Sequence, residues 1–211
     1  MLHLLALNAG RPVHRETLVE ALWPDLASDA AMRNVHVVVS SLRRLLDAAA
    51  VAGTGSFIRR EGDTYNLELG AAADIDLMTF QAGGAAALAA NAAGDTEAVI
   101  RGGEIALAAY RGEVLPEAGP AEWVVGEREY YRMQAAEVAQ LVADAELRRH
   151  QPRAAVAACD RGLRIDRYRD SLWHTQISAY ELLGETAGAA RVRLSYERVL
   201  ADLGVGGTGR A

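Results

Sequence analysis

The first 70 residues alternate apolar and polar positions in a pattern that predicts three helices followed by a hairpin. A short apolar helix begins at Leu2 and ends at the turn signal Asn8-Ala9-Gly10-Arg11-Pro12. A second helix of about nine residues follows in HRETLVEALWPD and ends at Pro24, which cannot continue a helix. Its predicted core residues are Leu18, Leu22 and Trp23.

The third helix is predicted over Ala30–Leu46, although it contains three consecutive valines that favour strands. At about 100° per residue, one face collects the apolar positions Val35, Val38, Val39, Leu42, Leu45 and Leu46. The opposite face carries Arg33, Val37, Ser40 and Arg44, flanked by His36, Ser41 and Arg43. The segment has a charge of +3 and no acidic residue. Arginines, small hydroxyls and one apolar side chain are the groups that contact phosphates and base edges. A core helix with an arginine-rich rim is the alternative interpretation.

A β-hairpin is predicted over residues 57–69, because Tyr65, Leu67 and Leu69 alternate with polar residues after a turn at 61–63. Arg59 and Arg60 lie beside that turn. Adjacent strand residues point to opposite faces, so we expect only one of them to reach a phosphate or the minor groove well. Three helices and a hairpin are the order of a winged helix-turn-helix, whose third helix enters the major groove of DNA.

The remainder of the chain is predicted to be helical. Helix pairs are expected over 76–95 with 96–117, over 121–150 with 152–166, and over 170–185 with 186–204. The turns near Gln151 and Gly184 are 33 residues apart, which is close to the 34-residue helical hairpin repeat. Alanines are expected at the tight crossings, namely Ala145, Ala155, Ala179 and Ala190. We predict a mainly α protein with a winged helix-turn-helix at 1–70, helical hairpin repeats at 74–204 and a flexible tail at 205–211.

Charge restricts where DNA could bind. The net charge is −6, with seven arginines and eight acids (−1) in residues 1–70, and fifteen and twenty (−5) in residues 71–211. DNA contacts must therefore rest on local patches, and the C-terminal part suits protein partners better. All 22 basic residues are arginine, which excludes a phosphate-loop or Schiff-base lysine.

No set of catalytic residues emerges from the sequence. Cys159, the only cysteine, lies among alanines and is predicted to be a buried core residue. The five histidines show no metal-ligand spacing. No apolar run approaches the 18 residues of a membrane span. We expect a cytoplasmic protein that is not an enzyme, with no cofactor, no metal and no membrane partner.

Several motifs together resemble the actinobacterial antibiotic regulatory proteins. They are LLALNAGRPVHRETLVEALWPD, NVHVVVSSLRRLL, TYNLEL, ADIDLMTFQAG, YRGEVLP, EWVVGEREYYR, AACDRGLRID and HTQISAYELLGETAGAARVRLSYERVL. The resemblance implies an OmpR-type winged helix followed by a bacterial transcriptional activator domain built of tetratricopeptide-like repeats. It implies binding to promoter repeats in double-stranded DNA through helix 30–46 and the wing at 57–69. It also implies contacts with RNA polymerase, and it puts loop 24–29 near the region that can face the polymerase. It further implies dimerisation through the activator domain.

The family's winged helix is normally preceded by a short antiparallel sheet, and here no strand signal precedes Leu2. We therefore expect either a start further upstream or a less stable DNA-binding half. Two functions remain open. The first is a DNA-binding activator that contacts DNA through Arg33, His36, Val37, Ser40, Ser41, Arg43, Arg44, Arg59 and Arg60. The second is a protein-interaction or dimerisation module whose winged helix does not bind DNA alone.

Overall fold

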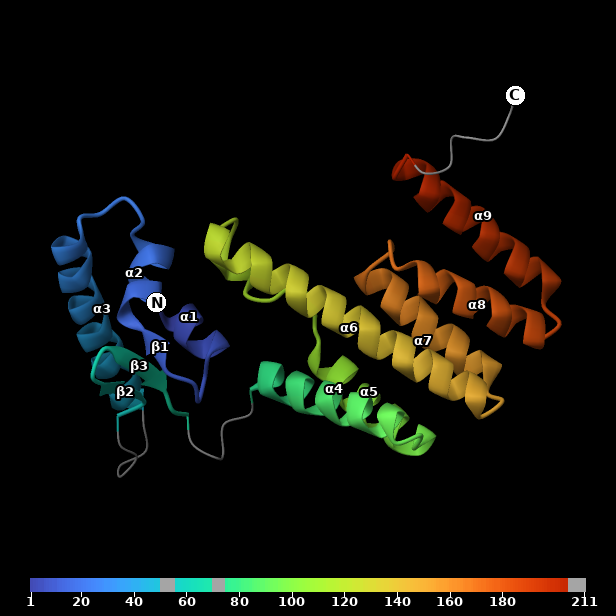
Figure 1. The fold of residues 1–211 in the computed structure, drawn as a ribbon, viewed down its shortest axis with the longest axis horizontal. Coiled ribbons are helices and arrows are strands. Elements are labelled where there is room, and N and C mark those ends of the chain that lie inside the picture. The colour runs from blue at the N-terminus through green and yellow to red at the C-terminus, as the bar shows by residue number, and fades with distance from the viewer. Residues whose placement is uncertain (50–55, 70–74, 205–211) are drawn as a thin grey trace. The chain divides into compact units, whose positions relative to one another are not determined.

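The structure is a computed structural model, and it describes residues 1–49, 56–69 and 75–204 (Figure 1). The predicted tail at 205–211 lies outside the described residues. The chain divides into two compact units. Unit 1 comprises Met1–Asp74 and Leu115–Val125, and unit 2 comprises Ile75–Val114 and Gly126–Ala211. Each unit is described by itself.

Unit 1 contains three helices and a small antiparallel sheet. The helices are α1 (Leu2–Leu7), α2 (Arg15–Leu22) and α3 (Ser28–Ala49), and the strands are β1 (Val13–His14), β2 (Ile58–Glu61) and β3 (Thr64–Leu67). The strand order is β1-β3-β2, with Val13 opposite Tyr65 and Ile58 opposite Leu67. The hairpin turns at Gly62, whose φ of +58° is a conformation that glycine adopts readily. The predicted winged helix-turn-helix is confirmed, and α3 extends beyond the predicted 30–46 at both ends.

Strand β1 was not predicted. It has only two residues, which are too few for apolar and polar positions to alternate, and it runs directly into α2. His14 ends the strand and also caps α2, because its Nδ1 accepts a hydrogen bond from the backbone N–H of Glu16 (3.3 Å). One short segment therefore positions both the sheet and the second helix.

The core of unit 1 joins all three helices to the sheet. Its fully buried side chains include Leu5, Leu18, Val35, Ile58, Tyr65 and Leu67. Leu22 and Trp23, which were predicted as core residues, are half-buried and pack against this core, and so does Trp123.

The predicted apolar face of α3 is wrong at one position, because Leu45 is 70% exposed. Val35 and Val39 are buried and mark the centre of the inward face, from which Leu45 lies about 100° around the helix. Val38, Leu42 and Leu46 are half-buried, so the inward stripe is narrower than the sequence pattern indicated.

All the regular secondary structure in the described residues of unit 2 is α-helical. Its helices are α4 (Asp76–Ala92), α5 (Thr96–Ala109), most of α6 (Glu122–Arg148), α7 (Pro152–Ile165), α8 (Asp170–Leu182) and α9 (Thr186–Asp202), while a 3-10 turn at Pro116–Ala118 belongs to unit 1. Helix α4 packs against α5, α7 against α8, and α8 against α9 (Figure 1). The prediction of a mainly helical protein with successive helical hairpins is confirmed.

Small residues bring the helices of unit 2 close together. Ala145, Ala155 and Ala179 are fully buried, as predicted, but Ala190 is exposed and Ala189 is buried in its place. The reason is the adjacent Gly188, where an added Cβ would lie 2.5 Å from the ring of Tyr180. Gly188 and Ala189 thus form the contact with α8, which turns Ala190 outward.

Cys159 is a buried residue of α7, as predicted. Burial, with the nearby charges of Asp144 and Asp160, raises the pKa of its thiol to about 12. The thiol of an unfolded chain ionises at a pKa of about 8.5. Between these two values the unfolded state binds fewer protons than the folded state, so folding stability falls as pH rises.

We therefore expect the free energy of unfolding to decrease as the pH rises above about 8.5. The Cys159 thiol should account for a decrease of at most about 1.4 kcal/mol per pH unit. Urea titrations at pH 8 and pH 10 would measure the slope, with Cys159→Ala as the control. A variant that loses stability with pH as steeply as the unaltered chain would show that the thiol is not responsible.

Candidate nucleic-acid interface

The outward face of α3 presents the stripe that the sequence predicted. Arg33, Val37, Ser40 and Arg44 are all exposed, and Val37 is 64% exposed despite its apolar side chain. On the other side of the helix, Val35 and Val39 are buried in the core of unit 1. Because that core holds the helix, the orientation of the stripe is set by packing.

The two arginines of the stripe have no acidic partner among the described residues. Arg44 donates a hydrogen bond from Nη2 to the hydroxyl of Ser41 (3.3 Å), and Arg33 makes no hydrogen bond or ion pair within the described chain. Acidic residues stand at helical spacing from both, Asp29 four residues before Arg33 and Asp47 three residues after Arg44, but neither forms an ion pair with them. Both guanidinium groups therefore remain available to a ligand.

The flanking residues differ in how accessible they are. His36 is exposed, whereas Ser41 is half-buried and accepts the hydrogen bond from Arg44. Arg43 is half-buried, and its Nε donates to the backbone carbonyl of Ile58 in β2 (2.9 Å). Arg43 therefore ties the helix to the wing.

The wing carries both predicted arginines on its exposed surface. Nε of Arg59 lies 3.0 Å from a carboxylate oxygen of Glu68. Arg60 donates from Nε to the carbonyl of Gly62 (2.9 Å), and its guanidinium lies 5.9 Å from the centre of the Tyr65 ring. Arg60 thus has no carboxylate partner among the described residues, which makes it the better placed of the two to meet a phosphate.

The wing as a whole is not basic. Residues 56–69 contain two arginines and three acids, which gives a net charge of −1. Glu68 pairs with Arg59, and Asp63 pairs with Arg15 of α2 (2.7 Å). The second pair anchors the hairpin turn on the helix that precedes α3. The wing therefore contributes position and shape more than charge.

Sequence reasoning missed the contributions of Arg15 and Trp123 to this unit. Arg15 reads as an ordinary exposed residue at a helix start, and only the fold brings it to Asp63. Trp123 lies at the start of α6, more than fifty residues beyond β3, yet it packs against the core of unit 1. No local pattern signals either contact.

The described residues offer no site for a metal, since none of their His, Cys, Asp and Glu side chains cluster in groups of three or more that could hold one. Within the same ranges, no helix is both long and apolar enough to cross a membrane.

Comparison with known families matches both parts of the chain. The family described as bacterial transcriptional activator domain matches residues 75–208. The family described as transcriptional regulatory protein, C terminal, matches residues 1–59.

Individual relatives agree with these matches. The transcriptional regulatory protein EmbR of Mycobacterium tuberculosis is 30% identical over 206 residues, which cover 96% of this chain and 52% of the relative. MoaR1 of the same organism is 27% identical over 180 residues, covering 85% of this chain and 58% of that protein. The solved structure of M. tuberculosis EmbR in complex with a low-affinity phosphopeptide superposes with a TM-score of 0.77 at 27% identity, covering 95% of this chain and 52% of that one. The chain thus spans about half the length of the curated relatives it matches.

Proposed function

We propose that this chain, which belongs to the bacterial transcriptional activator domain family, is a transcriptional regulator that binds promoter DNA through the outward face of α3. The observation that carries the proposal is the exposed stripe Arg33, Val37, Ser40 and Arg44, whose arginines lack acidic partners in the described chain. In a winged helix-turn-helix this face enters the major groove. Arginine can bind a guanine edge bidentately, and valine can contact a thymine methyl.

The other predicted contacts fall into two groups. Ser40 within the stripe, and His36 and Ser41 at its borders, can donate to phosphates or bases. Arg60 extends from the wing toward the neighbouring DNA backbone. Arg43 and Arg59 are already bonded within the unit, so we assign them supporting roles at the edges of the interface. Promoter DNA also implies a cytoplasmic location.

We further propose that the protein activates transcription by contacting RNA polymerase. Residues 24–29, which comprise the loop after α2 and the first two residues of α3, are exposed throughout, and Leu26 is 43% exposed. The helical hairpins of unit 2 supply a second protein surface, through which we propose that two copies dimerise on repeated promoter sites.

A protein-interaction module that does not bind DNA alone is the second candidate function. The observation that favours it is the net charge of −1 on the wing, where Arg59 is neutralised by Glu68. In that case the helical hairpins would supply the binding surfaces.

Replacing Arg33 or Arg44 by alanine is expected to weaken DNA binding by about 1–3 kcal/mol if the side chain reads a base. If it contacts only phosphate, affinity should fall evenly for all sequences. Fluorescence anisotropy with a duplex enriched from a random-sequence library, beside a scrambled duplex, would separate these results. Arg101→Ala, on the exposed face of α5, is the matched control. Unchanged affinity in both stripe variants would contradict the proposed orientation of α3.

A further inference from the structure

A groove lies across α7, α8 and α9 of unit 2, with a volume of about 590 Å³. We call it the arginine groove, because four of its lining side chains are Arg164, Arg167, Arg191 and Arg198. Arg164 and Arg167 come from the end of α7 and the loop after it, and the other two come from α9. The hairpins therefore bring together arginines that lie about thirty residues apart in the sequence. Its volume is in the range of pockets that hold small ligands or a few residues of a peptide.

The groove has little acid to balance its arginines. Among the described residues that line it, Asp160 is the one carboxylate, and it accepts a hydrogen bond from the buried amide of Gln176. Arg167 pairs with Asp202 (2.7 Å). Arg164, Arg191 and Arg198 have no hydrogen bond or ion pair with any described residue. In a protein of net charge −6, this is a local concentration of unpaired positive charge.

Apolar and aromatic side chains line the groove between the arginines. They are Leu163, Trp173, Tyr180, Val192 and Val199. One face of Trp173 stacks on Tyr196, with ring centres 5.8 Å apart, and Tyr180 packs against Gly188. Each of these two rings has one face covered by its neighbour and cannot stack bases on both sides. The groove therefore suits one aliphatic or aromatic side chain, placed between Trp173 and Tyr180, more than a row of stacked bases.

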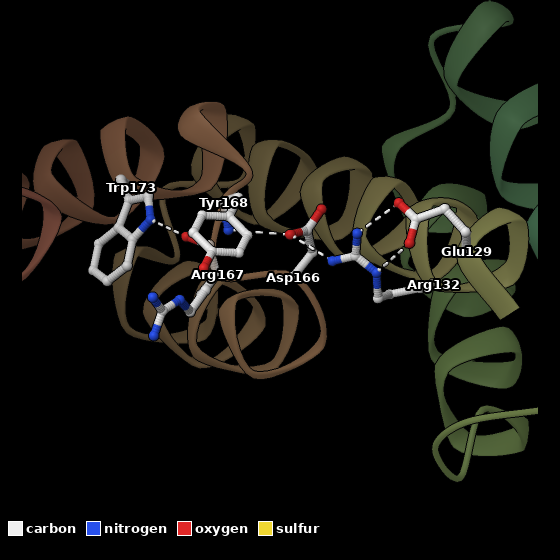
Figure 2. A network of polar contacts seen from close by, with 6 residues as sticks. All are labelled: Glu129, Arg132, Asp166, Arg167, Tyr168 and Trp173. Atoms are coloured by element: carbon white, nitrogen blue, oxygen red, sulfur yellow. Dashed lines mark hydrogen bonds and ion pairs between the residues drawn. The ribbon is translucent and has the colours of Figure 1, made fainter. Parts of the chain in front are cut away.

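A chain of polar contacts holds one wall of the groove in place (Figure 2). Glu129 and Arg132 of α6 form an ion pair, and Arg132 also lies 2.8 Å from a carboxylate oxygen of Asp166, at the end of α7. The indole N–H of Trp173 donates to the backbone carbonyl of Arg167 (2.8 Å). These contacts fix the loop between α7 and α8 before any partner arrives, which lowers the entropy lost on binding.

We propose that the arginine groove binds an acidic segment of another protein in an extended conformation. Carboxylates of the segment pair with Arg164, Arg191 and Arg198, and an apolar side chain enters between Trp173 and Tyr180. Arginine is suited to this task because its planar guanidinium binds carboxylates bidentately. Duplex DNA fits less well, since its sugar-phosphate backbone offers no apolar side chain to enter between the two rings. The proposal is independent of DNA binding by α3.

Fluorescein-labelled ten-residue peptides, in which glutamate and aspartate flank a leucine, phenylalanine or tryptophan, would test this with the full 211-residue chain. Each acidic peptide is compared with its glutamine and asparagine counterpart. We expect acidic members to bind, and their amide counterparts to bind at least about tenfold more weakly, because charge-assisted hydrogen bonds are lost. Arg191→Ala or Arg198→Ala should weaken binding by a similar factor, whereas the exposed Arg101→Ala and Arg153→Ala should not.

Each contrary outcome would overturn the proposal. Equal binding of acidic and amide peptides would exclude carboxylate recognition, and no binding by any peptide would exclude the groove as a peptide site. Groove variants that bind as tightly as the two controls would place the peptide elsewhere. A single-stranded oligonucleotide that binds the groove more tightly than the acidic peptides, and loses affinity in the groove variants, would identify nucleic acid as the ligand. Circular dichroism of each variant confirms that it is folded.

Discussion

Gly83→Ala is expected to lower the free energy of unfolding by about 3 kcal/mol, although alanine ordinarily strengthens a helix. A Cβ at this position of α4 would lie 2.8 Å from both the backbone nitrogen of Ala106 and the carbonyl oxygen of Gly102 in α5. Backbone atoms cannot rotate aside as a flexible side chain would. The two helices would have to separate along their contact, losing the burial of Phe80, Ala87 and Val99.

The chain offers a matched control in Gly126→Ala. Gly126 also lies within a helix, but an added Cβ there meets nothing within 4 Å. It should therefore stabilise the protein by about 0.5–1 kcal/mol, the ordinary preference of a helix for alanine over glycine. Urea unfolding followed by far-ultraviolet circular dichroism would measure both variants. Stabilisation by both would show that α4 and α5 do not approach each other as closely as the structure has them.

Tyr65→Ala is expected to destabilise unit 1 by about 3–5 kcal/mol, the usual cost of removing a buried aromatic ring. Tyr65 is 2% exposed and lies on the central strand, opposite Val13 on one side and Arg60 on the other. Its loss would leave a cavity under all three strands. Since the same core holds α3, DNA binding should weaken together with folding.

Hydrogen exchange resolves this effect by segment. Amides of α3 and β3 should exchange at least about a hundredfold faster in Tyr65→Ala, while those of α7 and α8 keep their protection. Tyr65→Phe is the control and should cost less than about 1.5 kcal/mol, because it preserves the volume of the ring. Equal loss of protection in both units would contradict the division of the core into two parts.

Helices and their faces were predictable wherever a long segment repeats its apolar positions. The stripe on α3 and the helices of unit 2 follow from a period near 3.6, which holds over many turns. The errors occur where the pattern is short or displaced by one residue. Strand β1 is too short to show alternation, Leu45 lies at the edge of its stripe, and Ala190 was chosen one residue beyond the buried Ala189.

Contacts between distant segments could not be predicted in the same way. Gly83 and Gly102 read locally as weak points in a helix, yet they let the backbones of α4 and α5 meet, while the adjacent Gly84 and Gly103 face side chains of α6. The arginine groove requires the hairpin geometry, because its arginines come from α9 and the end of α7. The sequence also predicted that only one of Arg59 and Arg60 would reach DNA well, but the structure is needed to see that Arg59 is the one paired with an acid.

The most direct test of the central claim is the salt dependence of DNA binding by this 211-residue chain. We predict specific binding, with an association constant that falls as salt concentration rises. A plot of the logarithm of this constant against the logarithm of salt concentration should be linear, and each neutralised phosphate adds about −0.9 to its slope. In Arg44→Ala the slope should become shallower by about one if that arginine contacts a phosphate. A folded chain that binds no duplex at low salt, or binds with no salt dependence, would contradict DNA recognition by α3 and favour the protein-interaction module.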